Sequence, residues 1–116
     1  MYVSGMKLDK ELVAASSAPL VLSVLSEGDS YGYAIIQRVK ELSGGKIEWT
    51  DGMLYPVLHW LEEQGLIRGR WEKAETGRRR RYYSIQKKGK EFLEEQREQW
   101  TAVNSTFEKM RRLKYA

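Results

Sequence analysis

The sequence predicts a mainly α-helical fold with one small β-hairpin and a long C-terminal helix. Three observations carry this prediction. Apolar residues recur at helical spacing in three stretches before residue 65, two β-prone stretches flank a turn-rich segment after it, and the remaining residues are charged and helical in composition. A chain of 116 residues has room for one domain with one modest core.

The first two helices are expected at residues 9–25 and 31–43. Pro19 lies inside the first helix. Because an interior proline removes one backbone hydrogen bond, we expect a kink or a break there. Ser30 is a suitable N-cap for the second helix, and two consecutive glycines at 44–45 end it.

The third helix is expected at residues 51–64, with Thr50 as its N-cap and a glycine just after it. Pro56 disfavours a regular first turn in this helix. Beyond the glycine, residues 66–73 and 80–85 are β-prone and are separated by the turn-rich letters A-E-T-G-R. This pattern predicts a hairpin with a flexible tip.

The last helix is expected at residues 86–114 and carries a short heptad seam. A helix of this length cannot bury an apolar stripe on so small a body, so it needs a partner, most simply a second copy of the chain. With one residue of the first helix, the seam forms the expected dimer interface: Leu12, Leu93, Trp100, Val103, Phe107 and Met110.

Charge is unevenly distributed along the chain. Residues 1–67 hold five Lys or Arg against nine acidic residues, whereas residues 68–90 hold ten against two, and residues 91–116 hold five of each. The positive block therefore coincides with the hairpin and the start of the last helix, where it attracts a polyanion.

Several classes of protein are disfavoured by what the sequence lacks. It has no cysteine, so disulfides and thiolate metal sites are excluded, and no apolar run approaches the ~18 residues that cross a bilayer. Its first residues do not resemble a secretion signal, which leads us to expect a cytoplasmic protein without membrane contact. The lone histidine, His59, has no second histidine nearby, and no phosphate-binding loop is present, so we expect neither an enzyme nor a metal or cofactor site.

The order of the elements describes a winged helix-turn-helix, because two short helices with a glycine-marked connection precede a basic hairpin. We assign residues 1–85 to this DNA-binding domain, with residues 1–7 expected to be disordered. Residues 86–116 form the dimerisation helix, which is expected to pack with the first helix.

The expected DNA contacts lie on the outward face of the third helix, at the start of the second helix and at the hairpin tip. Alternate side chains of a strand face opposite ways, so about half of the arginine run is expected to touch DNA. The alternatives are a solvated charged turn for the arginines and core packing for the aromatic residues. The candidates are Tyr31, Thr50, Gly52, Met53, Tyr55, His59, Arg78, Arg79 and Arg80.

Three segments also match a known pattern: Y-G-Y-A-I-I at residues 31–36, L-Y-P-V-L-H-W-L-E-E-Q-G-L-I at 54–67 and T-G-R-R-R-R-Y-Y-S-I-Q-K-K-G-K at 76–90. Together they resemble the PadR family of transcriptional regulators, over residues 8–113. The short last helix is similar to that of the compact branch, which includes multidrug-efflux repressors. The chain departs from the family at Met53, where a small hydroxyl residue is usual, and at Gln86, where threonine is usual.

The resemblance implies a winged-helix dimer whose first and last helices build the interface. The third helix would enter the major groove, and the wing tip would lie on the adjacent backbone or minor groove. We therefore expect a sequence-specific DNA-binding transcriptional regulator, a repressor that binds a pseudo-palindromic operator as a homodimer. The alternative is a basic nucleic-acid-binding module without sequence specificity.

A small-molecule effector is a further expectation, because Trp100 is a large flat aromatic residue on the seam with small or polar residues expected opposite it. The effector would be a planar apolar or cationic aromatic compound bound between the subunits. The alternative is that Trp100 only fills the interface. The expected effector residues are Ala15, Ser16, Trp100, Val103 and Asn104.

Overall fold

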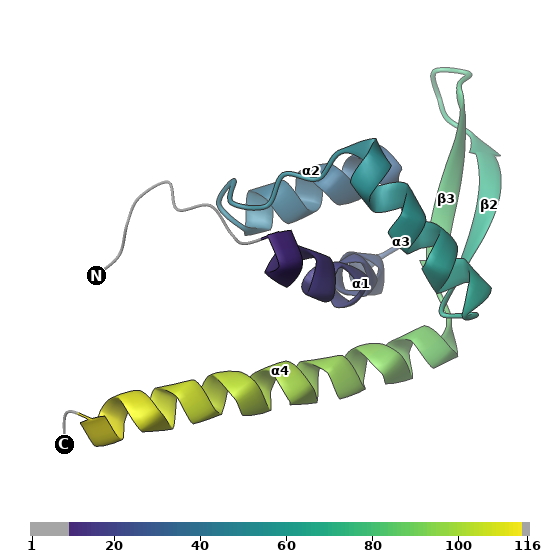
Figure 1. Cartoon of the computed structure of the whole chain (residues 1–116). Coiled ribbons are helices and arrows are strands. Elements are labelled where there is room, and N and C mark those ends of the chain that lie inside the picture. Colours follow the sequence, from purple (N-terminus) through teal and green to yellow (C-terminus); the bar gives the residue numbers. More distant parts are fainter. Residues whose placement is uncertain (1–9, 115–116) are drawn as a thin grey trace.

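A computed structural model of the chain describes residues 10–114. The described residues form four helices and three strands. Figure 1 shows the last helix extending away from the rest. This confirms the predicted fold class, while the expected disorder of residues 1–7 lies outside the described residues. The elements are α1 Lys10–Glu27, β1 Ser30–Tyr31, α2 Gly32–Leu42, α3 Asp51–Glu63, β2 Ile67–Lys73, β3 Arg79–Ile85 and α4 Lys87–Lys114.

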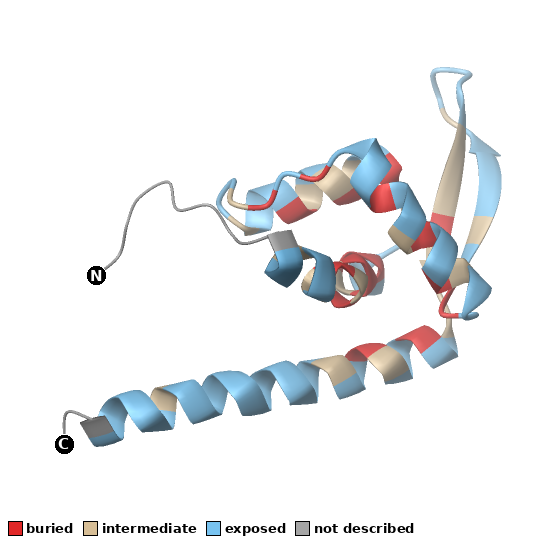
Figure 2. Cartoon of the chain, viewed as in Figure 1, coloured by how far each residue is buried: buried red, intermediate tan, exposed pale blue. Residues whose placement is uncertain are grey.

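The core lies between the first three helices and the base of the sheet, where the buried residues are concentrated (Figure 2). Helix α3 buries Leu54, Leu58 and Leu61, whose spacing of three and four places them on one helical face. Helix α2 buries Ile35 and Val39 by the same spacing. The most deeply buried residues of α1 are Val21, Leu22 and Leu25.

The three strands form one antiparallel sheet in the order β1-β3-β2. Strands β2 and β3 form the predicted hairpin, in which Trp71 pairs with Arg81 and Gly69 with Tyr83. Strand β1 is an addition to the prediction: Ser30 pairs with Tyr83 instead of capping α2, and Tyr31 occupies the N-cap position without a side-chain cap. We call the β2–β3 hairpin the wing.

Helix α4 begins against the body of the fold and then leaves it. Lys88 donates from Nζ to the carbonyl of Gln64 at 2.9 Å, and Leu93 is only 3 % exposed within the core. The rest of α4 runs on below α1 with almost all of its residues exposed (Figures 1 and 2). Leu93 was predicted to face a partner subunit, and this is wrong, because its side chain is covered by its own chain.

Two prolines lie inside helices that continue through them. A kink or a break was expected at Pro19; helix α1 is unbroken there, which excludes the break, and Pro19 is itself buried. Helix α3 begins at Asp51 and continues through Pro56, whose missing N–H would have bonded to the carbonyl of Gly52 in the exposed first turn. Between residues 10 and 114, no helix is long and apolar enough to cross a membrane.

Candidate nucleic-acid interface

The N-terminal turn of α3 is exposed and capped. Thr50 accepts a hydrogen bond from the backbone N–H of Met53 at 3.3 Å, as its position predicted. Residues 50–53 are all exposed, and a Cβ placed on Gly52 would meet nothing closer than Thr50 Oγ1 at 3.8 Å. The packing of the chain therefore does not require a glycine at position 52.

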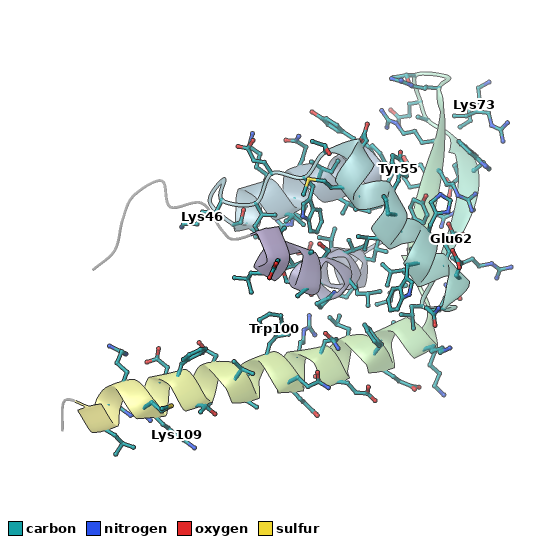
Figure 3. All side chains as sticks on the ribbon, viewed as in Figure 1. Lys46, Tyr55, Glu62, Lys73, Trp100 and Lys109 are labelled. Atoms are coloured by element: carbon teal, nitrogen blue, oxygen red, sulfur yellow. The ribbon has the colours of Figure 1, made fainter. Side chains whose placement is uncertain are left out.

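The outward face of α3 is polar and aromatic. Tyr55 is 44 % exposed and His59 is exposed, one helical turn apart, whereas Glu62 is half-buried. Figure 3 shows Tyr55 and Glu62 on α3 toward the wing. Gly32, at the start of α2, leaves room for the hydroxyl of Tyr55, since a Cβ there would lie 3.2 Å from that oxygen.

A hollow of about 930 Å³ separates α3 from the wing. It unites residues from the start of α2, the outward face of α3 and the wing, which are far apart in the sequence. Six of the nine predicted DNA contacts line it: Tyr31, Tyr55, His59, Arg78, Arg79 and Arg80. The other three, Thr50, Gly52 and Met53, lie on the adjoining exposed turn of α3.

The four consecutive arginines at residues 78–81 of the wing differ in their environments. Arg81 forms an ion pair with Glu62 of α3, with Nη2 3.0 Å from Oε2. The guanidinium of Arg80 lies 4.4 Å from the centroid of the Tyr31 ring, and that of Arg79 lies 5.3 Å from the centroid of Trp71. Arg78 is exposed at the turn and forms no ion pair or ring contact with any residue between 10 and 114.

The alternation expected along β3 is present. Arg79 and Arg81 lie on the face of the wing that carries Trp71, and Arg80 lies on the opposite face with Tyr31. On that second face, the rings of Tyr31 and Tyr82 meet edge to face at 5.3 Å between centroids. Both faces of the wing therefore hold guanidinium groups against aromatic rings.

Seven residues that line the hollow were not among the predicted DNA contacts: Gly32, Tyr33, Asp51, Glu62, Trp71, Arg81 and Tyr83. Trp71 could have been predicted from the hairpin. A register that pairs Trp71 with Arg81 places both side chains on one face of the wing. No sequence pattern indicated a role for Glu62, because its partner Arg81 lies 19 residues away in the chain. Burial, with a further effect of the Glu62 carboxylate, raises the pKa of Tyr83, so its phenol stays neutral in the hollow.

The residues predicted to bind an effector are not all brought together. A second hollow, of about 350 Å³, lies between α1 and α4 and is lined by Ser16 and Trp100. Ala15, Val103 and Asn104 are exposed and do not line it within this chain. Residues that were not predicted to bind the effector complete the lining: Pro19, Leu20, Ser23, Leu93, Arg97 and Thr101.

The predicted dimer residues other than Leu93 remain exposed. On α4, Trp100 is 39 % exposed and Phe107 is 69 % exposed, and Leu12 of α1 is also exposed. Val103, Met110 and Leu113 extend the same pattern along α4. We call the exposed residues Trp100, Val103, Phe107 and Met110 the α4 stripe.

The fold and this site define a class of protein, the winged helix-turn-helix regulators that bind DNA. Within that class, the chain belongs to the transcriptional regulator PadR-like family, whose family model matches residues 21–95. The resemblance found in the sequence is thereby confirmed.

Individual relatives agree with this assignment. The chain is 38 % identical over 80 residues to transcriptional regulator YqjI of Escherichia coli (strain K12), covering 69 % of this chain but only 37 % of the relative. A solved transcriptional regulator from Clostridium thermocellum superimposes with a TM-score of 0.79 at 27 % identity, covering 88 % of this chain and 96 % of that one. A solved PadR family transcriptional regulator from Eggerthella lenta gives a TM-score of 0.71 at 33 % identity, covering 86 % and 85 %.

Proposed function

We propose that this chain is a cytoplasmic homodimeric repressor that binds a pseudo-palindromic operator. One observation carries the proposal: the outward face of α3 and the arginines of the wing line the same hollow. A recognition helix reads base edges with its first turns, while guanidinium groups bind phosphates or a narrow minor groove. When α3 and the wing arginines face the same duplex, α3 supplies the sequence preference and the arginines supply most of the affinity.

The first turn of α3 supports the readout part of this proposal. Gly52 is exposed and no neighbour occupies the space of its missing side chain, so its small size serves no packing purpose. A glycine there allows the backbone of α3 to approach the floor of a major groove. Met53 and Tyr55 lie beside it, where Met53 offers apolar contact to a thymine methyl group and Tyr55 offers a hydroxyl.

The α4 stripe supports the dimer. Four large apolar side chains at heptad spacing are between 39 % and 69 % exposed, on a helix whose earlier residue Leu93 is only 3 % exposed. Large contiguous apolar patches on a small protein mark an interaction surface. A second copy of the same helix offers a matching stripe, which makes a two-fold dimer the simplest partner.

A comparison of two duplexes tests the proposal. The affinity for DNA upstream of the chain's own gene is measured against a random duplex of equal length at one salt concentration. We expect tighter binding to the upstream DNA, by about a thousandfold or more for a specific regulator. A ratio near one would favour the basic module without sequence specificity, and sequencing of DNA fragments retained by the protein would then show no shared motif.

We further propose that a planar aromatic effector binds against Trp100 and changes operator affinity. The hollow beside Trp100 has a volume of about 350 Å³, within the usual size range of small-molecule sites. Arg97 lines the same hollow. The guanidinium of Arg97, which also lies 3.4 Å from a carboxylate oxygen of Glu94, is a donor for an anionic group, so we propose a neutral or anionic compound in place of the cationic one that the sequence left open.

Trp100→Ala tests the effector site with two fluorescent probes, an anionic naphthalene sulfonate and a cationic acridine. The parent should bind the anionic probe more tightly, and the variant should lose that binding. Because Trp100 also belongs to the α4 stripe, sedimentation of the variant shows whether the dimer is retained, and the comparison is made at a protein concentration at which the variant is dimeric. Thr106→Ala, farther along α4, is the control. Unchanged probe affinity in the Trp100 variant would place the pocket elsewhere.

A further inference from the structure

The Arg81–Glu62 ion pair connects the wing to α3. Its two side chains are 33 % and 28 % exposed, which makes it the least exposed ion pair between residues 10 and 114. Arg81 Nη2 donates to Glu62 Oε2 at 3.0 Å across 19 residues of sequence. The pair therefore joins two elements that are otherwise held together at the base of the wing, while the wing itself projects outward (Figure 1).

Gly69 makes room for this connection. A Cβ on Gly69 would lie 2.6 Å from Nη2, 2.7 Å from Cζ and 2.8 Å from Nε of Arg81, so the guanidinium group crosses directly over the glycine. The rings of Trp71 and Tyr83 lie 5.8 and 5.7 Å from Arg81 Cζ. A glycine inside a strand weakens the strand, and here its position coincides with the path of Arg81 to α3.

Glu62 is unexpected in a surface that attracts DNA. A carboxylate in the hollow repels phosphate, and the apolar core packs without it, since α3 buries Leu54, Leu58 and Leu61 instead. Its contact with Arg81 explains its presence. The ion pair also directs Arg81 toward the protein, in contrast to Arg78 at the tip.

We propose that the Arg81–Glu62 ion pair, seated over Gly69, fixes the spacing between the wing and the recognition helix so that both engage one operator half-site. Arg81 and Glu62 are then positioning residues, and neither is a DNA contact. This inference rests on the proposed function. It also makes a prediction opposite in sign to simple electrostatics, because removing the negative charge of Glu62 should weaken operator binding.

Glu62→Gln is the central experiment. Operator affinity should fall about three- to fivefold, the range expected from a partly exposed ion pair, whereas affinity for a random duplex should stay constant or rise. Glu63→Gln is the matched control, since Glu63 is the exposed neighbour on α3 and has no ion pair within residues 10–114. The control should bind both duplexes as the parent does or slightly more tightly.

Gly69→Ala separates the position of Arg81 from its charge. The added methyl group displaces the flexible guanidinium from Glu62 while the net charge stays the same. Operator affinity should fall as in Glu62→Gln, without a lower melting temperature, because alanine suits a strand at least as well as glycine. The double variant Glu62→Gln/Gly69→Ala should bind no more weakly than either single variant, since both disrupt one interaction.

Arg81→Gln distinguishes a positioning role from direct binding of DNA. The slope of log affinity against log salt should match that of the parent for Arg81→Gln, whereas removing a phosphate-binding cation lowers the slope by about one. Tighter operator binding by Glu62→Gln, equal changes on both duplexes, or a reduced slope for Arg81→Gln would each overturn the inference. Absence of any operator preference in the parent would instead contradict the proposed function.

Discussion

The four consecutive wing arginines differ in their surroundings, and the surroundings decide what each guanidinium group can do. Arg81 is engaged by a carboxylate, and Arg80 lies over a tyrosine ring at 4.4 Å. Arg79 keeps a looser ring contact at 5.3 Å, and Arg78 stands exposed at the turn. The four side chains are chemically identical, but the protein engages them to different degrees. The guanidinium group nearest the tip of the wing has the fewest contacts within the chain and is therefore the most available to bind a phosphate.

The available arginines should carry the salt dependence of DNA binding. Changing Arg78 and Arg79 together to alanine should weaken binding to all duplexes by a similar factor. It should also lower the slope of log affinity against log salt by about two, because each arginine that binds a phosphate contributes about one. Arg112→Ala near the end of α4 removes the same kind of charge from an exposed site and is the control. An unchanged slope in the double variant would remove the wing tip from the interface.

Gly52 offers a second test at a single residue, in which folding and binding should change in opposite directions. Alanine is the better helix former, and a Cβ at position 52 has open space, so Gly52→Ala should raise stability by up to about 1 kcal/mol. Operator affinity should fall, because the methyl group holds the backbone away from the base edges. Urea unfolding and a binding titration measure the two effects, and a variant that binds as well as the parent would exclude close backbone approach.

At the scale of elements, the features that the sequence predicted depend on residues close together in the chain. The features that it did not predict depend on contacts between residues far apart in the chain. The bounds of α3 followed from Thr50 as its cap and from apolar spacing, both of which act within a few residues. Strand β1 was missed because two residues have no periodicity, and its pairing depends on β3, which lies far along the chain. The heptad spacing identified Leu93 as apolar and inward, but spacing alone does not say whether the same chain or a partner covers it.

The junction of α4 with the body depends on one glycine, which leads to a prediction about stability. A Cβ on Gly89 would lie 2.1 Å from the backbone oxygen of Leu66, an atom that also accepts the N–H of Gln86 at 2.9 Å. Gly89→Ala must therefore shift α4 or the start of β2, at a cost of about 1–3 kcal/mol. Urea unfolding should show this decrease, in contrast to the increase expected for Gly52→Ala. Parental stability would mean that α4 moves freely at its first turn.

At the scale of the whole molecule, the core and the proposed dimer surface lie on different parts of α4. Leu93 belongs to the core of its own chain, whereas the α4 stripe lies beyond it and is exposed. The molecule extends 60 Å along its longest axis, much of it along α4. A change in the stripe should consequently alter assembly without altering the fold of the winged domain.

Phe107→Glu tests this separation. Phe107 is 69 % exposed, so a charge there costs the single chain little but places two carboxylates in the proposed interface. Sedimentation should show a folded monomer for the variant and a dimer for the parent. Ser105→Glu adds the same charge about half a helical turn away, on the opposite face of α4, and should remain dimeric. A parent that sediments as a stable monomer at micromolar concentration would contradict the dimer.

The same pair of proteins tests how the dimer reads DNA. Two recognition helices that enter successive major grooves on one side of a duplex lie about 34 Å apart, so the half-sites of the operator must be about one helical turn apart. Inserting about five base pairs between them turns one half-site to the far side of the duplex. The parent should then bind far more weakly, because the second half-site gains its strength from the first through the dimer.

The Phe107→Glu monomer should bind the original operator weakly and be indifferent to the insertion, since it occupies each half-site independently. If the parent tolerated the insertion as well as the monomer does, the two half-sites would not be bound by one rigid dimer.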